Sequence, residues 1–304
     1  MPYRLSRLGY IEVRVLDLDD ALQHYVNVLG LIVTGREGRR AYLKGWDEKH
    51  AYSLILTESD TLGMERMAFR TVSPEDLEYY KDRLKKLNVP FATIESDYKR
   101  GEAIRAETPS GHTVELYYTM EYTGNVLPDV NPPPWPMDLK GIGVPRLDHC
   151  LVTAADPTKT IRWFENVLEL RPSEYVLNGS GDPIAAWLWQ RPAPHDVAVV
   201  PGPDAKFHHC AFAVETPEQV FRACDILAMT KTKIDYGPSR HGITRGTTVY
   251  FFDPFGNRNE TFGVHSAYQL DPDHKPICWT EDALGQGVFY YEREIIESFL
   301  SVVT

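Results

Sequence analysis

Cysteine is scarce in this sequence, with four residues among 304 and none in a CxxC pair. This excludes a disulfide scaffold and a zinc or redox site built on paired cysteines. Positive charge is also in deficit, since the net charge is −11 and no basic stripe is present. We therefore expect no nucleic-acid partner.

Long apolar runs are absent as well. No stretch approaches the roughly 18 apolar residues of a membrane span, and the N-terminus has no apolar core of signal-peptide length. At 43% hydrophobic and 25% charged residues, the composition is that of an ordinary globular protein. We expect a soluble, cytoplasmic protein without a membrane partner.

An internal repeat is the most informative feature that is present. The pattern P-x-G-x-x-x-E occurs at Pro109–Glu115 and again at Pro254–Glu260. Two further segments match between the halves, and they carry Tyr10 and Arg66 in the first half but histidines in the second. The first half thus has Tyr, Arg and Glu where the second has His149, His209 and Glu260. Two imidazoles and one carboxylate on a strand-rich scaffold are the ligand set of a non-haem Fe(II) oxygenase.

Strand alternation predicts which neighbours share the face of each candidate ligand. A lone histidine in a strand is more often a core or rim residue than a ligand, but here three equivalent strands carry donors in one half only. His208 should point away from His209, and Cys150 and Cys210 should be small packing residues on the opposite face. The expected partners on the ligand faces are Leu147 and Leu151 with His149, Phe207 and Ala211 with His209, and Arg258 and Phe262 with Glu260.

Strand and helix signals recur four times along the chain. Each quarter begins with a strand and continues with a helix and further strands, and the helices are expected near 18–29, after Ser73, near 158–170 and after Thr216. A stretch rich in Pro, Asn and Gly interrupts this series. We predict two-module domains at residues 1–121 and 145–263, a linker at 122–144, and an aromatic-rich C-terminal extension at 264–304 that packs on the second domain or on a neighbouring subunit.

Three residues of the second half could act beside the candidate ligands. His195 is expected at the start of a strand, His241 lies in a Gly-containing turn, and Tyr250 lies in an aromatic strand where a core role is the commoner one. Histidine exchanges protons near neutral pH, which makes the two imidazoles acid–base candidates.

The sequence around these positions resembles the extradiol ring-cleavage dioxygenases of the catechol 2,3-dioxygenase type. The matching segments are Leu147–His149, Phe207–Phe212, Arg240–Thr244 and Val249–Glu260, with further matches at Leu139–Gly141 and Asp273–Pro276. The resemblance implies an α+β, vicinal-oxygen-chelate fold of four βαβββ modules paired into two open-barrel domains. It also implies Fe(II) on His149, His209 and Glu260, acid–base or hydrogen-bonding roles for His195, His241 and Tyr250, and a homotetramer.

The activity that this resemblance implies is cleavage of a small aromatic diol, catechol or a methyl- or chloro-substituted catechol, with O₂ to 2-hydroxymuconate semialdehyde. Mn(II) suits the same donor set as Fe(II). Two alternatives share the fold: a metal-dependent isomerase or lyase of the glyoxalase type, which would not consume oxygen, and a ligand-sequestering protein, which would have degenerate metal positions in both halves.

Overall fold

The computed structural model describes residues 3–304 and contains two mixed β-sheets. The first sheet has the strand order β2-β3-β4-β1-β5-β8-β7-β6. Its strands are β1 (Leu5–Val15), β2 (Ile32–Glu37), β3 (Arg40–Lys44), β4 (Leu54–Glu58), β5 (Gly63–Thr71), β6 (Phe91–Ile94), β7 (Ala103–Glu107) and β8 (Thr113–Tyr117), and its helices are α1 (Leu18–Asn27) and α2 (Pro74–Lys86).

The second sheet repeats this order and adds one strand from the C-terminal extension, giving β14-β15-β16-β13-β9-β12-β11-β10-β17. Its strands are β9 (Arg146–Ala154), β10 (Arg171–Leu177), β11 (Pro183–Trp189), β12 (Val197–Pro201), β13 (Lys206–Val214), β14 (Ile234–Arg240), β15 (Thr247–Phe252), β16 (Arg258–Gly263) and β17 (Ile277–Thr280). Its helices are α3 (Pro157–Val167) and α4 (Pro217–Met229), followed in the extension by η1 (Val264–Ser266), η2 (Glu281–Ala283), α5 (Leu284–Val288) and α6 (Glu297–Ser301).

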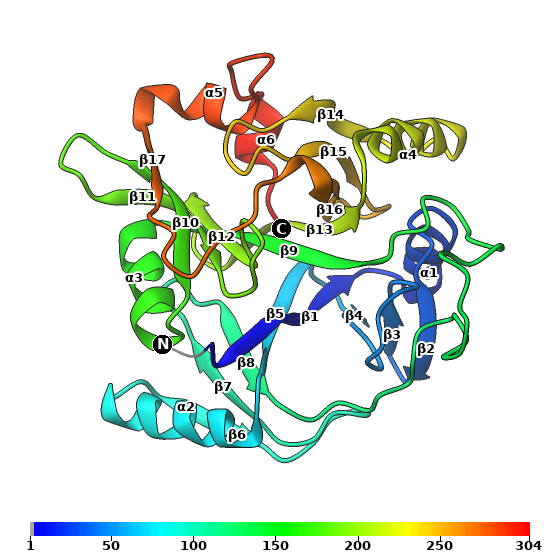
Figure 1. The fold of residues 1–304 in the computed structure, drawn as a ribbon, viewed down its shortest axis with the longest axis horizontal. Helices are drawn as coiled ribbons and strands as arrows, with labels where there is room; N and C mark the ends of the chain where they lie inside the picture. The colour runs from blue at the N-terminus through cyan, green and yellow to red at the C-terminus, as the bar shows by residue number, and fades with distance from the viewer. Residues whose placement is uncertain (1–2) are drawn as a thin grey trace.

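Both sheets are built from the same strand pairs. In each, two module-opening strands run antiparallel at the centre, β1 with β5 and β9 with β13, and each of these strands pairs in parallel with the last strand of its own module. The predicted α+β fold of four βαβββ modules is confirmed. The two sheets meet where β1 and β5 approach β9 and β13, near the middle of Figure 1.

Local sequence accounts for the starts of the helices. Asp17, Ser73 and Asp156 each accept a backbone N–H of the first turn of α1, α2 and α3, and a proline opens α2, α3 and α4. The repeated P-x-G motif forms the turn before the last strand of each half. Gly111 and Gly256 there have φ of 76° and 109°, values that favour glycine.

The stretch from 122 to 144 contains no helix or strand and runs between the two sheets. The domain boundaries at 121, 144 and 263 remain predictions. The extension packs against the second sheet, as expected: β17 pairs with β10, and the chain end returns to β13, where Phe207 and Thr304 exchange backbone hydrogen bonds (Figure 1).

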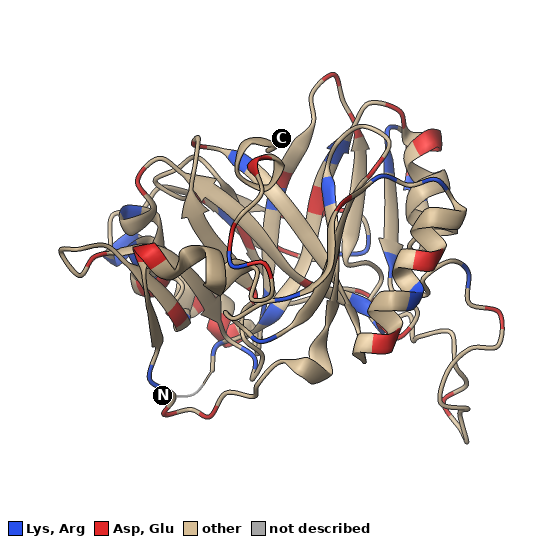
Figure 2. Ribbon diagram, turned by 90° about the horizontal axis from the view of Figure 1, so that it is seen from above, with Lys and Arg blue, Asp and Glu red and all other residues tan. Residues whose placement is uncertain are grey.

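Basic and acidic residues are interspersed along the strands, helices and loops of the ribbon in Figure 2, and the net charge is −11. Within residues 3–304, no helix has the length and apolar character that crossing a bilayer requires.

Candidate metal centre and active-site cavity

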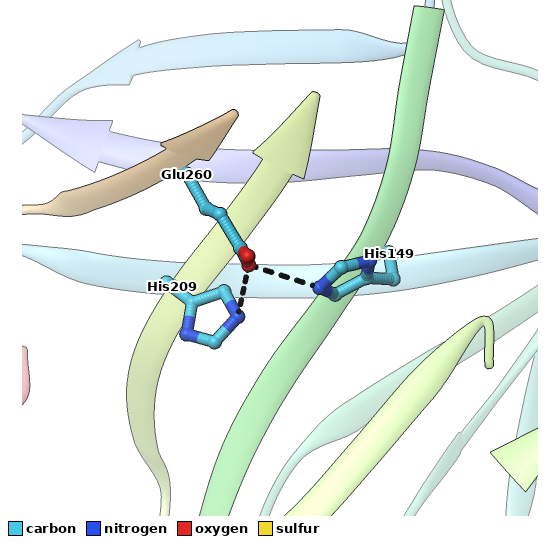
Figure 3. Close-up of side chains that lie close together, drawn as sticks. All are labelled: His149, His209 and Glu260. Carbon is cyan, nitrogen blue, oxygen red and sulfur yellow. Dashed lines mark hydrogen bonds and ion pairs between the residues drawn. The ribbon is translucent and has the colours of Figure 1, made fainter. Parts of the chain in front are cut away.

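His149, His209 and Glu260 come together from three adjacent strands of the second sheet. Their side chains project from β9, β13 and β16 toward a common point (Figure 3). Glu260 Oε2 lies 3.1 Å from His149 Nε2 and 3.1 Å from His209 Nε2. One donor atom of each residue falls within 4.8 Å of the others, and all three side chains are buried.

Two β-bulges decide which neighbours share the ligand face. The β9–β13 ladder shifts register between Phe207 and His209 on β13, and again opposite Leu147 and His149 on β9. Each bulge inserts one residue and reverses the alternation beyond it. The prediction that Leu147 and Phe207 share the ligands' face is therefore wrong, because both side chains belong to the hydrophobic core with Cys150.

The bulge between Phe207 and His209 on β13 also shows that the prediction for His208 is wrong. Alternation placed it on the face opposite His209, but both side chains line one cavity. Their Nδ1 atoms lie 2.6 Å apart, and His208 Nε2 is 2.7 Å from the carbonyl oxygen of Phe299. If His208 donates through Nε2 to that carbonyl, its Nδ1 accepts from His209 Nδ1–H. This leaves the lone pair of His209 on Nε2, facing Glu260.

His149 is oriented in a similar way by an acidic neighbour. Its Nδ1 donates to Asp148 Oδ2 at 2.8 Å, so that Nε2 faces Glu260. Burial disfavours charge on His149, but hydrogen bonds to Asp148 and Glu260 outweigh burial and raise its pKa to about 9. Burial lowers the pKa of His209 to about 4. Although burial opposes ionisation of Glu260, hydrogen bonds from the surrounding imidazoles hold its pKa well below the usual range.

This set of groups fits a divalent cation. His209 Nε2 is buried and has no hydrogen-bond partner of adequate geometry, and Glu260 supplies the anionic charge. Two imidazole nitrogens and one carboxylate leave several coordination positions open for other ligands. Thr248 Oγ1 donates to Glu260 Oε1 at 2.5 Å, which fixes the carboxylate.

The equivalent position of the first half is filled by the protein's own cations. Glu115 is fully buried, accepts a hydrogen bond from Tyr10, and lies 3.0 Å from Arg100 Nε and 2.6 Å from Arg105 Nε. Arg66, which stands where the second half has His209, is 3.7 Å from the same carboxylate. Guanidinium groups thus neutralise Glu115, and Tyr10, Arg66 and Glu115 do not form a set of lone pairs like that of His149, His209 and Glu260.

A cavity of about 230 Å³ adjoins the ligands, and all three further candidates line it. The ring of His195 lies 3.8 Å from that of His149, centroid to centroid, and its buried Nδ1 has no hydrogen-bond partner. His195 precedes β12 rather than beginning it, so it is held by a loop. Tyr250 Oη is 3.1 Å from His241 Nε2, and His241 Nε2 is 3.5 Å from Glu260 Oε1.

The protonation states of these groups differ. Burial and the adjacent His149 lower the pKa of His195 well below its ordinary value, so His195 is neutral at pH 7. Burial and the charge of Glu260 raise the pKa of Tyr250 well above its ordinary value, so its hydroxyl keeps its proton. His241 is anchored by its Nδ1, which bonds to the carbonyl oxygen of Val288 in the extension.

The remaining wall is mostly apolar, and much of it comes from the C-terminal extension. Trp187 lines the cavity from β11. The extension contributes Leu284, Val288, Ile295, Phe299 and Leu300. No lysine, arginine or carboxylate side chain is among the cavity-lining residues of the described chain.

Sequence reasoning missed several residues that support the site. Asp148 had a usable signal, because a carboxylate next to a candidate metal-binding histidine is a common orienting partner. Thr248 and Phe299 had none, since their contacts with Glu260 and His208 depend on strand register and on the return of the chain end.

The known proteins that this chain is similar to include several dioxygenases. Over 99% of both chains, the sequence is 42% identical to the metapyrocatechase of Pseudomonas sp. (strain CF600). It is 28% identical to the manganese-dependent 2,3-dihydroxybiphenyl 1,2-dioxygenase of Geobacillus genomosp. 3, over 97% of this chain and 96% of that one. The crystal structure of the 2,3-dioxygenase LapB from Pseudomonas sp. KL28 superposes with a TM-score of 0.88 at 39% identity, covering 92% of this chain and 98% of that one.

Homoprotocatechuate 2,3-dioxygenase from Arthrobacter globiformis is also similar, with a TM-score of 0.89 at 26% identity over 98% of this chain and 91% of that one. A family model matches residues 7–116 and again 146–261, the two halves of the internal repeat. With this double match, the repeated sheets and the resemblance to metapyrocatechase, the chain belongs to the Glyoxalase/Bleomycin resistance protein/Dioxygenase superfamily.

Proposed function

We propose that this protein is an extradiol dioxygenase that cleaves catechol, or a methyl- or chloro-substituted catechol, with O₂ to 2-hydroxymuconate semialdehyde or its substituted form. One diol and one O₂ yield one ring-opened product that contains both oxygen atoms. The observation that carries the proposal is the buried His149–His209–Glu260 cluster at the wall of an apolar cavity that also holds protic side chains.

The metal we propose for this cluster is Fe(II). When bound, the ion would acidify the catechol hydroxyls and bring the diol and O₂ together. Mn(II) is the second candidate, because it accepts the same donors and one relative is manganese-dependent by name. Metal analysis of protein purified without added metal salts distinguishes the two.

His195 is assigned the acid–base role. It is neutral, buried and has a free Nδ1 beside the ligands, so it can accept the proton of a catechol hydroxyl. Once protonated, it can return that proton to an oxygen atom as the ring opens. Its fixed place against the ring of His149 keeps it close to the bound diol.

Tyr250 and His241 are assigned to the substrate oxygens. The hydroxyl of Tyr250 keeps its proton and can donate a hydrogen bond to a deprotonated catechol oxygen. His241 donates from Nδ1 to the extension, and its Nε2 lies 3.1 Å from Tyr250 Oη. It would stabilise charge that develops on the substrate when Nε2 also carries a proton.

The cavity supports a single-ring substrate without a charged substituent. A cavity of about 150 Å³ accommodates benzene in a protein core, and the volume here is about 230 Å³. The difference leaves room for two hydroxyls and a small apolar group.

We also propose that the enzyme is cytoplasmic and forms a homotetramer. Light scattering of the purified protein measures its oligomeric state.

Oxygen uptake tests the activity against the glyoxalase-type alternative. Anaerobically Fe(II)-loaded protein is mixed with catechol in an oxygen electrode, with the His149→Ala variant as control. We expect one O₂ consumed per catechol, and no uptake by the variant. Absence of uptake by metal-loaded wild-type protein, together with isomerase activity on a thiol adduct of an α-keto aldehyde, would reject the dioxygenase proposal.

A further inference from the structure

A chain of charged contacts leads from the candidate metal ligand His149 to the loop that carries His195. Asp148 accepts from His149 through Oδ2, and its Oδ1 accepts from Arg191 Nη2 at 2.8 Å. Arg191 Nε lies 3.3 Å from Asp196 Oδ1. Both carboxylates are buried, and Arg191 is the cation that lies between them.

The far end of this chain closes the loop that carries His195. Asp196 Oδ2 accepts the backbone N–H groups of Gln190 and Arg191 at 2.9 and 3.4 Å. The Asp196 side chain, at the end of this loop, therefore holds the start of the loop at Gln190 and Arg191 by hydrogen bonds. His195 is the residue immediately before Asp196. Arg191 belongs to the same loop, so its guanidinium connects this loop to the partner of a metal ligand.

The first sheet also reaches the network. The backbone N–H of Leu8, in β1, donates to Asp196 Oδ1 at 3.0 Å. Leu8 lies two residues from Tyr10, the position that corresponds to His149 in the first half. Through this hydrogen bond, the half of the chain without candidate metal ligands helps to hold Asp196 in the half that has them.

We propose that Arg191 is a positioning residue, which couples the orientation of His149 to that of the loop bearing His195. The part of this inference that concerns His195 rests on the proposed function. The part that concerns metal binding through His149 does not. A guanidinium suits the task because its planar fork can contact two carboxylates at once, whereas an ammonium is a single point of charge.

Arg191→Met tests the coupling, because it removes the guanidinium and keeps an unbranched apolar stem. We expect the affinity of the metal-free protein for Mn(II), measured by competition with a chelator, to fall by about 10- to 100-fold, the range for lost orienting partners of metal ligands. We also expect kcat for catechol at saturating Fe(II) to fall, because Asp196, which closes the loop of His195, loses its guanidinium partner.

Two further variants test the contacts of Arg191 with Asp196 and with Asp148 one at a time. Asp196→Asn should lower kcat and, because Asp196 and Asp148 share Arg191 as a partner, should also lower Mn(II) affinity, though by less than Arg191→Met does. Asp148→Asn should lower Mn(II) affinity, and combining it with Arg191→Met should lower the affinity less than the product of the single effects, because both act on His149 through one contact.

Arg162→Met is the matched control, since Arg162 lies on the surface of α3 and its ion pair is with Glu165, away from the metal site. It should leave Mn(II) affinity and kcat unchanged. Wild-type Mn(II) affinity in folded Arg191→Met, or independent effects in the double variant, would overturn the coupling. If circular dichroism shows Arg191→Met to be unfolded, Arg191→Lys is read instead, and wild-type Mn(II) affinity and kcat in that variant overturn it. Failure of wild-type protein to consume O₂ would reject the proposed function and leave the metal-affinity result intact.

Discussion

Metal binding at the candidate site should compete with protons, and the structure sets the size of the effect. Without metal, His149 has a pKa of about 9, because Asp148 and Glu260 stabilise its charged form. The ion can bind only after this proton leaves. At pH 7, two units below that pKa, about 1 molecule in 100 has lost the proton, which weakens the apparent affinity about 100-fold relative to its limit at high pH.

The pH dependence should have a slope of one proton. Because the pKa of His209 is about 4 and that of Glu260 lies well below its usual range, neither group binds a proton between pH 6 and 9. The affinity for Mn(II) should therefore rise about tenfold per pH unit from pH 6 to 8 and level off above pH 9.

Isothermal titration of metal-free protein with Mn(II), in buffers of different ionisation enthalpy, measures the affinity and counts the protons released. We expect close to one proton per ion at pH 7. An affinity that does not change between pH 6 and 8, with no proton release, would show that His149 is neutral in the metal-free protein and would refute the reasoning.

Four other substitutions probe the site and its counterpart in the first half. His195→Asn should keep its metal content and lose turnover by about 100-fold or more, the usual scale for a positioned acid–base group, and full activity would remove His195 from the mechanism. Glu260→Ala should lose the metal, whereas Glu115→Gln should keep one ion per chain. Urea unfolding of Glu115→Gln should show a loss of about 3–5 kcal/mol in unfolding free energy, since buried arginines lose their carboxylate partner. Loss of metal by Glu115→Gln would contradict the assignment of the two halves. Thr248→Val should weaken Mn(II) binding by about 10- to 100-fold through loss of the hydrogen bond to Glu260, and an unchanged affinity would show that this bond does not orient the ligand.

The sequence predicted the features that depend on local pattern and on repetition. Helix caps such as Ser73, the doubled P-x-G-x-x-x-E motif and the contrast between His209 and Arg66 are all visible in the sequence, and that contrast pointed to the candidate ligand set. The positions of His195, His241 and Tyr250 around one cavity were expected from resemblance, and the folded chain brings all three to it.

Features that depend on register could not be predicted in this way. A bulge adds one residue to one strand without a composition signal. The bulge on β9 places Leu147 on the core face, and the bulge on β13 places Phe207 on the core face and His208 at the cavity. The contacts of Arg191 with Asp148 and Asp196 require a loop to fold back over β9, which periodicity does not encode.

The central claim is that one divalent ion is held by His149, His209 and Glu260 while the first half of the chain holds none. Anomalous diffraction at the iron edge, from crystals of anaerobically Fe(II)-loaded protein, tests it most directly. The account predicts a single peak within bonding distance of those three side chains. A peak between Tyr10 and Glu115, or a bound ion that lacks any of the three proposed ligands, would contradict it.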